Sequence, residues 1–154
     1  FVQGLETLAL RMREHSKNTL AVANFLAGRK DVTRVIHPAY HTGTGAERTA
    51  KYMPHGQGGL VGFELAGGME AGRRFIDSLQ MFYHVANIGD ARSLAIHPAS
   101  TTHSQLSEAE QLATGVTPGY VRLSVGIEHI DDILADVAQA LDAASGTVTR
   151  KAAE

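Results

Sequence analysis

The fold of this chain is indicated most directly by one stretch, Val121-Arg122-Leu123-Ser124-Val125-Gly126-Ile127-Glu128. Apolar residues occupy every second position, and the residues between them are small, polar or charged. Because successive side chains of a strand point to opposite faces of a sheet, this alternation predicts a strand with one face against a core. Arg122, Ser124 and Glu128 then point away from that core.

The segments around this strand alternate between helical and strand-like patterns. Apolar residues recur at helical spacing in some, and β-branched or apolar runs bounded by glycine or proline mark others. The predicted helices are residues 4–27, 46–52, 69–79 and 131–144, and the predicted strands are residues 32–36, 60–65, 82–86 and 121–128. In the first helix, the stripe expected to face inward is Leu5, Leu8, Met12, Thr19, Val22 and Leu26.

These elements predict the α/β class, as an α+β two-layer sandwich with a small, mostly antiparallel sheet and helices on one face. Residues 87–107 lack periodicity and are predicted to form one long loop. A loop of that length inside a compact domain is usually functional or disordered.

Composition limits the classes of function. The chain has 154 residues, 44% hydrophobic and 19% charged, which suits one domain with a real core. We expect that domain at residues 1–145 and a flexible tail at 146–154. A formal charge of −2 argues against a broad nucleic-acid surface, and no apolar run approaches the ~20 residues that span a bilayer. Since cysteine is absent, thiol catalysis is excluded and a cytoplasmic location is expected.

The start of the sequence suggests a piece of a longer protein. The chain opens on Phe1 rather than Met and enters a helical pattern almost at once, without a signal peptide. A helix as long as residues 4–27 often crosses between domains, although a simple core helix explains the same pattern.

Three constellations invite a chemical interpretation that their spacing does not support. His97, His103 and Asp90 could bind a metal, but the histidines lack the spacing of zinc sites, so no metal is predicted. Ser93, His97 and Asp90 could form a hydrolase triad, but no G-x-S-x-G turn presents the serine. The glycines of residues 56–59 precede a strand rather than a helix, which favours a turn or close backbone approach over a phosphate loop.

Arg122 is the most informative single residue. It lies in the middle of the best strand, and Ser124 and Gly126 on its own face leave room for an anion beside the guanidinium. A planar fork of donors binds a carboxylate in a bidentate way, which suits an amino-acid substrate. An arginine on a solvated sheet face explains the pattern equally well.

The long loop and the strand that follows it resemble a known family. The loop begins Asn87-Ile88-Gly89-Asp90-Ala91-Arg92-Ser93-Leu94 and ends His97-Pro98-Ala99-Ser100-Thr101-Thr102-His103, and the strand segment is Thr117-Pro118-Gly119-Tyr120 followed by residues 121–128. Both resemble the C-terminal part of the Cys/Met-metabolism family of pyridoxal-phosphate enzymes, as do Gly4-Leu5-Glu6-Thr7-Leu8 and His55-Gly56-Gln57-Gly58-Gly59-Leu60. The resemblance covers residues 1 to about 144.

Within this family, the loop is most similar to the O-acetylhomoserine sulfhydrylase branch. Arg92 stands where cystathionine lyases and synthases typically have a glutamate. This resemblance implies that the whole enzyme converts O-acetyl-L-homoserine and sulfide or methanethiol to homocysteine or methionine and acetate, with pyridoxal phosphate as electron sink. It also implies a homo-oligomer, a tetramer for the whole enzyme.

Carried over by position, the resemblance implies that Arg122 binds the substrate carboxylate, with Ser93 and Leu94 around the same group. The catalytic lysine of the family lies in a Ser-x-Thr-Lys type segment, and none of the four lysines here has that context. No catalytic, cofactor-binding or metal residue is therefore predicted, and the chain is expected to be inactive alone. The lysines are Lys17, Lys30, Lys51 and Lys151.

Two alternatives to the sulfhydrylase remain. One is another enzyme of the family, such as a cystathionine γ-synthase or lyase. The other is a stand-alone domain that binds small carboxylates through Arg122.

Overall fold

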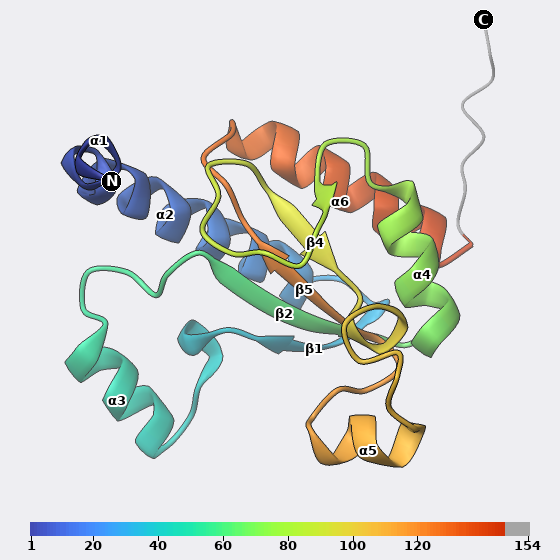
Figure 1. Ribbon diagram of the computed structural model, residues 1–154. Helices are drawn as coiled ribbons and strands as arrows, with labels where there is room; N and C mark the ends of the chain where they lie inside the picture. Colours follow the sequence, from blue (N-terminus) through green and yellow to red (C-terminus); the bar gives the residue numbers. More distant parts are fainter. Residues whose placement is uncertain (147–154) are drawn as a thin grey trace, which may run out of the picture.

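The structure is a computed structural model that describes residues 1–146 (Figure 1). Over those residues, a five-stranded sheet has the order β1-β2-β5-β4-β3. The strands are β1 (Val32–Ile36), β2 (Leu60–Leu65), β3 (Tyr83–His84), β4 (Leu94–Ile96) and β5 (Tyr120–Ser124). Neighbouring strands are antiparallel except β3 and β4, which are parallel. The predicted small, mostly antiparallel sheet is confirmed, and most of the predicted tail lies outside the described residues.

Helices complete the domain. They are α1 (Val2–Glu6), α2 (Leu8–Ala27), α3 (Thr44–Tyr52), α4 (Gly68–Ser78), α5 (Glu108–Ala113) and α6 (Ile130–Ala144). Two short 3₁₀ turns are η1 (Pro38–Tyr40) and η2 (Pro98–Ser100). None of the helices within residues 1–146 combines the length and apolarity that a membrane span requires.

The core lies between one face of the sheet and helices α2, α4 and α6. Alternate residues of the central strands are buried there, including Val61 and Phe63 of β2 and Val121 and Leu123 of β5. Phe63 meets Phe75 of α4 edge to face, with ring centroids 5.3 Å apart. Helices therefore cover one face, as predicted, and the residues of opposite parity face the other side of the sheet.

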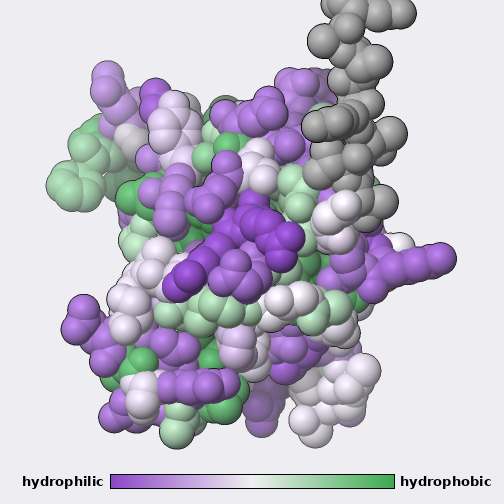
Figure 2. All heavy atoms as spheres, turned by 90° about the vertical axis from the view of Figure 1, so that its right-hand side faces the viewer, coloured by the Kyte–Doolittle hydropathy of each residue, from purple (hydrophilic) through white to green (hydrophobic). Residues whose placement is uncertain are grey.

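The outer side of this layer is polar. On α4, the apolar residues Phe75 and Ile76 are buried, whereas Arg73 and Arg74 are exposed. Figure 2 looks at the side of the molecule on which α4 lies and shows hydrophilic side chains gathered across its centre. Periodic placement of apolar and charged residues thus fixes which face of α4 packs on the sheet.

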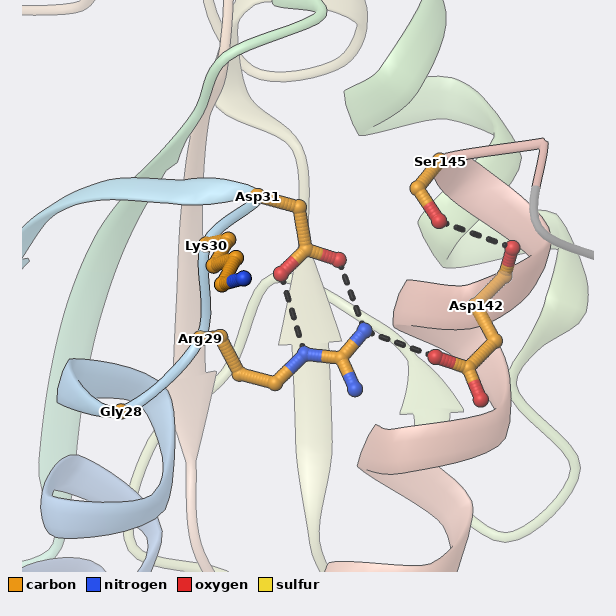
Figure 3. A pocket seen from close by; sticks show the side chains of 6 residues that line it. All are labelled: Gly28, Arg29, Lys30, Asp31, Asp142 and Ser145. Atoms are coloured by element: carbon orange, nitrogen blue, oxygen red, sulfur yellow. Dashed lines mark hydrogen bonds and ion pairs between the residues drawn. The ribbon is translucent and has the colours of Figure 1, made fainter.

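A group of ion pairs joins the end of α2 to the end of α6 (Figure 3). Arg29 donates to both oxygens of Asp31, from Nε at 3.0 Å and from Nη2 at 2.8 Å. The same Nη2 also donates to Asp142 of α6 at 2.7 Å. Because the guanidinium spans both carboxylates, it ties the entry to β1 to the last turn of α6.

The first predicted helix is interrupted and only half buried. It breaks at Thr7, between α1 and α2, and the inward stripe begins with the buried residues His15 and Thr19 rather than with Leu5. Leu5 is 67% exposed and Leu8 is 41% exposed. Figure 1 shows the reason: α1 and the start of α2 extend beyond the sheet, so no core lies beneath their apolar side chains.

The predicted long loop contains regular structure. Residues 87–107 include β4 and η2, and α5 follows directly. A three-residue strand is too short to show a period, so the pattern does not reveal it. α5 does have a sequence signal: Ser107 and Glu110 form a reciprocal capping box at its start.

The strand predicted at residues 121–128 ends at Ser124. Beyond that point, the backbone groups bond to a loop and a helix instead of a neighbouring strand. The N–H of Gly126 donates to the Ser93 hydroxyl at 2.9 Å, and the N–H of Ile127 donates to the Ala91 carbonyl at 2.9 Å. The alternation continues in the sequence, but these tertiary partners bend the chain out of the sheet.

The glycines before β2 act as the sequence predicts. Gly58 has a φ of +84°, which only glycine adopts readily, and its N–H donates to Ser16 of α2 at 3.2 Å. A Cβ at Gly56 would lie 2.8 Å from the Ser16 side chain. The segment therefore passes close to α2 because glycine at position 56 leaves room for Ser16.

Candidate carboxylate-binding site

Arg122 lies on the face of the sheet opposite the helices. Its Nη2 donates to the carbonyl of Asn87 at 3.1 Å. Its Nε is buried and has no hydrogen-bond partner among the described residues. A buried donor without an acceptor is costly, so this edge of the guanidinium is suited to an acceptor supplied by a ligand. A carboxylate matches that requirement because it can accept from two nitrogens of the fork.

Arg122 has uncharged neighbours on the adjacent strands and on its own strand. Gly62 of β2 and Ile96 of β4 are its partners across the sheet. The ring of Tyr120 lies over Gly62, where a Cβ would come within 2.7 Å of the phenol oxygen. Burial raises the pKa of Tyr120, while the Arg122 charge acts in the opposite direction and Glu64 adds to the increase. The phenol is therefore a neutral wall of the site at neutral pH.

The loop that begins at Asn87 lies against the same face of β5. Besides the bond from Arg122 to Asn87, the N–H of Gly89 donates to the Ser124 hydroxyl at 3.1 Å. Arg122 and Ser124 are two residues apart on one strand, so both contacts come from the same face. The loop itself is exposed from Asn87 to Arg92 and becomes buried at Ser93.

Ser93 is fully buried and fully engaged by the protein. Its N–H donates to Glu128 Oε1 at 2.6 Å, and its hydroxyl donates to Glu128 Oε2 at 2.9 Å. The same hydroxyl accepts from the N–H of Gly126. Leu94 is buried opposite Ser124 and shares the sheet face of Arg122. The structure thus places Leu94 on the sheet face of Arg122, opposite Ser124, whereas the polar groups of Ser93 hold the end of the loop.

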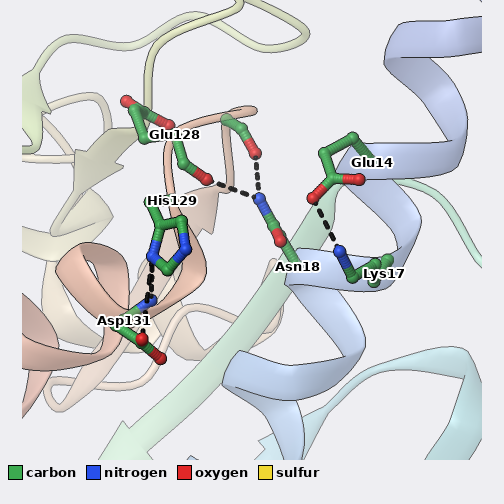
Figure 4. A network of polar contacts seen from close by, with 7 residues as sticks. Glu14, Lys17, Asn18, Glu128, His129 and Asp131 are labelled. Carbon is green, nitrogen blue, oxygen red and sulfur yellow. Dashed lines mark hydrogen bonds and ion pairs between the residues drawn. The ribbon is translucent and has the colours of Figure 1, made fainter.

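Helix α2 holds the turn that carries Glu128 (Figure 4). The side-chain amide of Asn18 donates to the carbonyls of Gly126 at 3.2 Å and Glu128 at 3.0 Å. His15 Nδ1 bonds to the carbonyl of Val125 at 2.6 Å. A carbonyl only accepts, so His15 carries its proton on Nδ1.

His97 is separate from this site. Its Nε2 donates to the Pro118 carbonyl at 2.7 Å, and its Nδ1 pairs with the Ser100 hydroxyl at 2.8 Å. Burial lowers its pKa, and the nearby Arg73 lowers it further, against the raising effect of the Pro118 carbonyl. Ser93 bonds to Glu128, and Asp90 accepts from the N–H of Arg92. Ser93, His97 and Asp90 therefore do not form the hydrolase triad considered from the sequence. Within residues 1–146, no three His, Asp or Glu side chains group as metal ligands.

Tyr120, Asn87 and Asn18 are parts of the site that the sequence did not reveal. A pattern of alternation assigns faces but not neighbours on other strands, so it missed the ring over Gly62. Asn18 lies off the apolar stripe of its helix yet is completely buried. Glu128 did carry a signal, since the alternation places it on the side of Arg122.

Comparison with known proteins defines the class. The sequence model of the Cys/Met metabolism PLP-dependent enzymes matches residues 1–142. The O-acetyl-L-homoserine sulfhydrylase of Leptospira meyeri is 54% identical over 141 residues, which cover 91% of this chain and 32% of that protein. The chain therefore spans about a third of the length of the curated relatives it matches.

Two solved structures share the fold. A Campylobacter jejuni protein described as an O-acetylhomoserine (thiol)-lyase, with N'-pyridoxyl-lysine-5'-monophosphate, has a TM-score of 0.83 and 45% identity over 91% of this chain and 33% of its own. The cystathionine γ-synthase of Xanthomonas oryzae, in complex with cystathionine, has a TM-score of 0.83 and 37% identity over 95% of this chain and 38% of its own. This chain belongs to the Cys/Met metabolism family of PLP-dependent enzymes.

The described lysines do not fit a covalent cofactor site. Lys17 is 68% exposed and pairs with Glu14 at 3.0 Å, Lys51 lies over the exposed ring of Tyr52, and Lys30 is exposed. A Schiff-base lysine needs a desolvated pocket, and these three side chains lie at the surface. Lys151 lies outside the described residues.

Proposed function

We propose that this chain is the C-terminal domain of a longer PLP-dependent enzyme and that Arg122 binds the α-carboxylate of its amino-acid substrate. The observation that carries this proposal is the buried Arg122 Nε without a partner among the described residues, beside a bonded Nη2. The small Gly62 and the neutral Tyr120 lie beside the guanidinium on this sheet face, and the nearby Glu64 is paired with Arg34 at 3.5 Å. Leu94 adds an apolar wall, and Ser93 fixes the adjoining loop.

For the whole protein, we propose an O-acetylhomoserine sulfhydrylase. It would convert O-acetyl-L-homoserine and sulfide or methanethiol to homocysteine or methionine and acetate. Two features support this choice: the sulfhydrylase of Leptospira meyeri is 54% identical, and Arg92 stands where cystathionine enzymes typically have glutamate. A cystathionine γ-synthase is the second candidate, because one shares the fold with 37% identity.

The division of labour follows from the residues present. The exposed lysines described above give this domain no group for the covalent chemistry of pyridoxal phosphate, so we propose that it is inactive alone. Its own part is to bind and orient the carboxylate end of the substrate. We further propose that the whole enzyme is a cytoplasmic homo-oligomer, as the family resemblance implies.

The test compares Arg122→Lys with the unchanged full-length enzyme. A point charge replaces a bidentate fork, so KM for the amino-acid substrate should increase at least about tenfold while KM for the thiol changes little. An unchanged KM for the amino acid would remove Arg122 from this role.

A second experiment tests the division of labour. The 154-residue chain is incubated with pyridoxal phosphate and borohydride, and the products are mapped by mass spectrometry. Scattered, low-level labelling of exposed lysines is expected. A single lysine trapped in high yield would contradict the proposed inactivity of the isolated chain.

A further inference from the structure

We infer that Glu128 is a positioning residue of the carboxylate site, acting through Ser93 on the loop that contacts Arg122. The inference rests on the proposed role of Arg122 and extends it to a residue that acts indirectly, through Ser93. The structural relationship is a chain of contacts from Glu128 to Ser93, along residues 87–93, and back to Arg122 through Asn87.

The Glu128 contact is the strongest attachment of this loop. Both carboxylate oxygens accept hydrogen bonds from one residue, at 2.6 Å from the Ser93 N–H and 2.9 Å from its hydroxyl. Hydrogen bonds to an ionised group contribute more than neutral ones, and these two share a buried partner. By contrast, the loop's contacts with Ser124 and Arg122 are single bonds of 3.1 Å.

Backbone packing reinforces the same junction. Gly126 approaches the loop so closely that an added Cβ would lie 2.5 Å from the Ala91 carbonyl and 2.6 Å from the Ser93 nitrogen, and would overlap the Glu128 carboxylate. The N–H of Ile127 donates to the same Ala91 carbonyl at 2.9 Å. The turn after β5 and the end of the loop therefore form one docked unit.

That unit is fixed from behind by α2. Asn18 binds the carbonyls of Gly126 and Glu128, and His15 binds the carbonyl of Val125. The carboxylate of Glu128 thus projects from an immobilised backbone toward the loop. Its position is set by a helix rather than by the loop that it holds.

The consequence concerns the orientation of Arg122. The guanidinium donates to the carbonyl of Asn87. Asn87 belongs to an exposed segment that ends at the buried residue Ser93. If Ser93 is released, the Asn87 carbonyl is held less firmly, with a single bond from Gly89 to Ser124 still attaching the loop nearby. The fork then loses the orientation that bidentate binding requires. The expected defect is selective for the carboxylate of the ligand.

The experiment uses the full-length enzyme carrying Glu128→Gln. The amide keeps the size of the side chain, but its NH₂ replaces one acceptor of the two Ser93 donors. Binding is measured with L-norvaline and L-norvalinamide as competitive inhibitors, which differ in the carboxylate. We expect the preference for norvaline over the amide to fall about tenfold, with KM for the amino-acid substrate raised and kcat changed less.

Asp142→Asn is the matched control. Asp142 also accepts a short hydrogen bond, from Arg29 at 2.7 Å, but it lies at the opposite end of α6. This variant should keep the carboxylate preference of the unchanged enzyme. Ser93→Ala is the second variant: it removes the hydroxyl contact from the other side and should shift the preference in the same direction, even if Glu128→Gln does not fold.

The outcomes distinguish the positioning role of Glu128 from the proposed binding of the carboxylate by Arg122. If Arg122→Lys abolishes the preference for norvaline but Glu128→Gln and Ser93→Ala preserve it, the positioning role is wrong and the carboxylate role of Arg122 remains. If Arg122→Lys itself preserves the preference, the proposed function is wrong. A loss of thermal stability without a change in the preference counts against the positioning role.

Discussion

Gly72 of α4 packs directly against the imidazole of His97. A Cβ at residue 72 would overlap His97 Nε2 and lie 2.6 Å from its Cδ2. His97 is buried, and both of its ring nitrogens are hydrogen-bonded, to Pro118 and Ser100. The ring therefore cannot move aside without breaking these bonds, and the glycine is required by packing rather than by backbone conformation.

Gly72→Ala should destabilise the chain by about 1–3 kcal/mol, the usual cost of an added methyl group in a filled interior. Helix propensity alone would make Gly72→Ala stabilising by about 1 kcal/mol. A decrease in the free energy of unfolding would therefore show that the added methyl group clashes with His97. Urea unfolding followed by circular dichroism measures it. Gly4→Ala in α1 is the control, because a Cβ there meets nothing within 4 Å. A neutral or stabilising Gly72→Ala would contradict the packing.

Stability should decrease as pH falls below about 6.5. Burial lowers the pKa of His97 and of His37 in the folded chain relative to the ordinary value of 6.5. A histidine with a depressed pKa binds its proton more readily when unfolded, so its contribution is complete above the unfolded pKa and is lost as pH falls toward the folded pKa. Urea unfolding at about pH 7.5 and 5.5 gives the free energy of unfolding at each pH. The difference between the two values should be smaller in the double variant His37→Gln/His97→Gln. An equal pH dependence in that double variant would contradict the assignment.

Asp136 of α6 should be essential for stability. Its carboxylate accepts from three successive backbone N–H groups, of Gln80, Met81 and Phe82, at 2.8, 2.8 and 3.2 Å. Asp136→Ala leaves three donors without their acceptor, of which the Phe82 N–H is buried, and should cost about 3 kcal/mol or more. Asp136→Asn should cost less because one oxygen remains. Asp142→Ala is the comparison: that side chain is 50% exposed, so the change should stay within about 1 kcal/mol.

The free energy of unfolding measured in urea for these three variants tests the order. Equal losses for Asp136→Ala and Asp142→Ala would mean that the turn before β3 does not depend on this carboxylate.

Arg29 should stabilise the chain in a pH-dependent way. Its hydrogen bonds lower the pKa of Asp31, against the raising effect of burial. Arg29→Lys replaces a two-point contact with a point charge and should cost about 1 kcal/mol near neutral pH. A carboxylate whose pKa is lowered by folding stabilises the chain above its unfolded pKa, and this contribution is lost as pH falls toward the folded pKa. The difference in free energy of unfolding between the unchanged protein and Arg29→Lys should therefore narrow below about pH 4. A gap that stays constant down to about pH 3 would contradict this ion pair.

Local pattern was sufficient for the helix layer and most of the sheet. β1 and β2 have the predicted bounds, and both ends of α4 and of α6 lie within one residue of the predicted bounds, because period and burial agree in these segments. The same reasoning failed for α1 and the start of α2. Their apolar stripe has the right spacing, but spacing does not say how far the sheet extends beneath a helix.

The sequence by itself determined the α+β class, the sheet face on which Arg122 lies, and the family to which its motifs point. The interleaving of helical and strand-like segments is enough for the class. Alternation of apolar residues along β5 is enough for the face of Arg122, since side chains of a strand have a period of two. Tertiary structure alone decided that the strand stops at Ser124, that Ser93 meets Glu128 rather than His97, and that Tyr120 covers Gly62. The contact between Ser93 and Glu128 joins residues 35 positions apart, and it satisfies buried polar groups that no local pattern can pair.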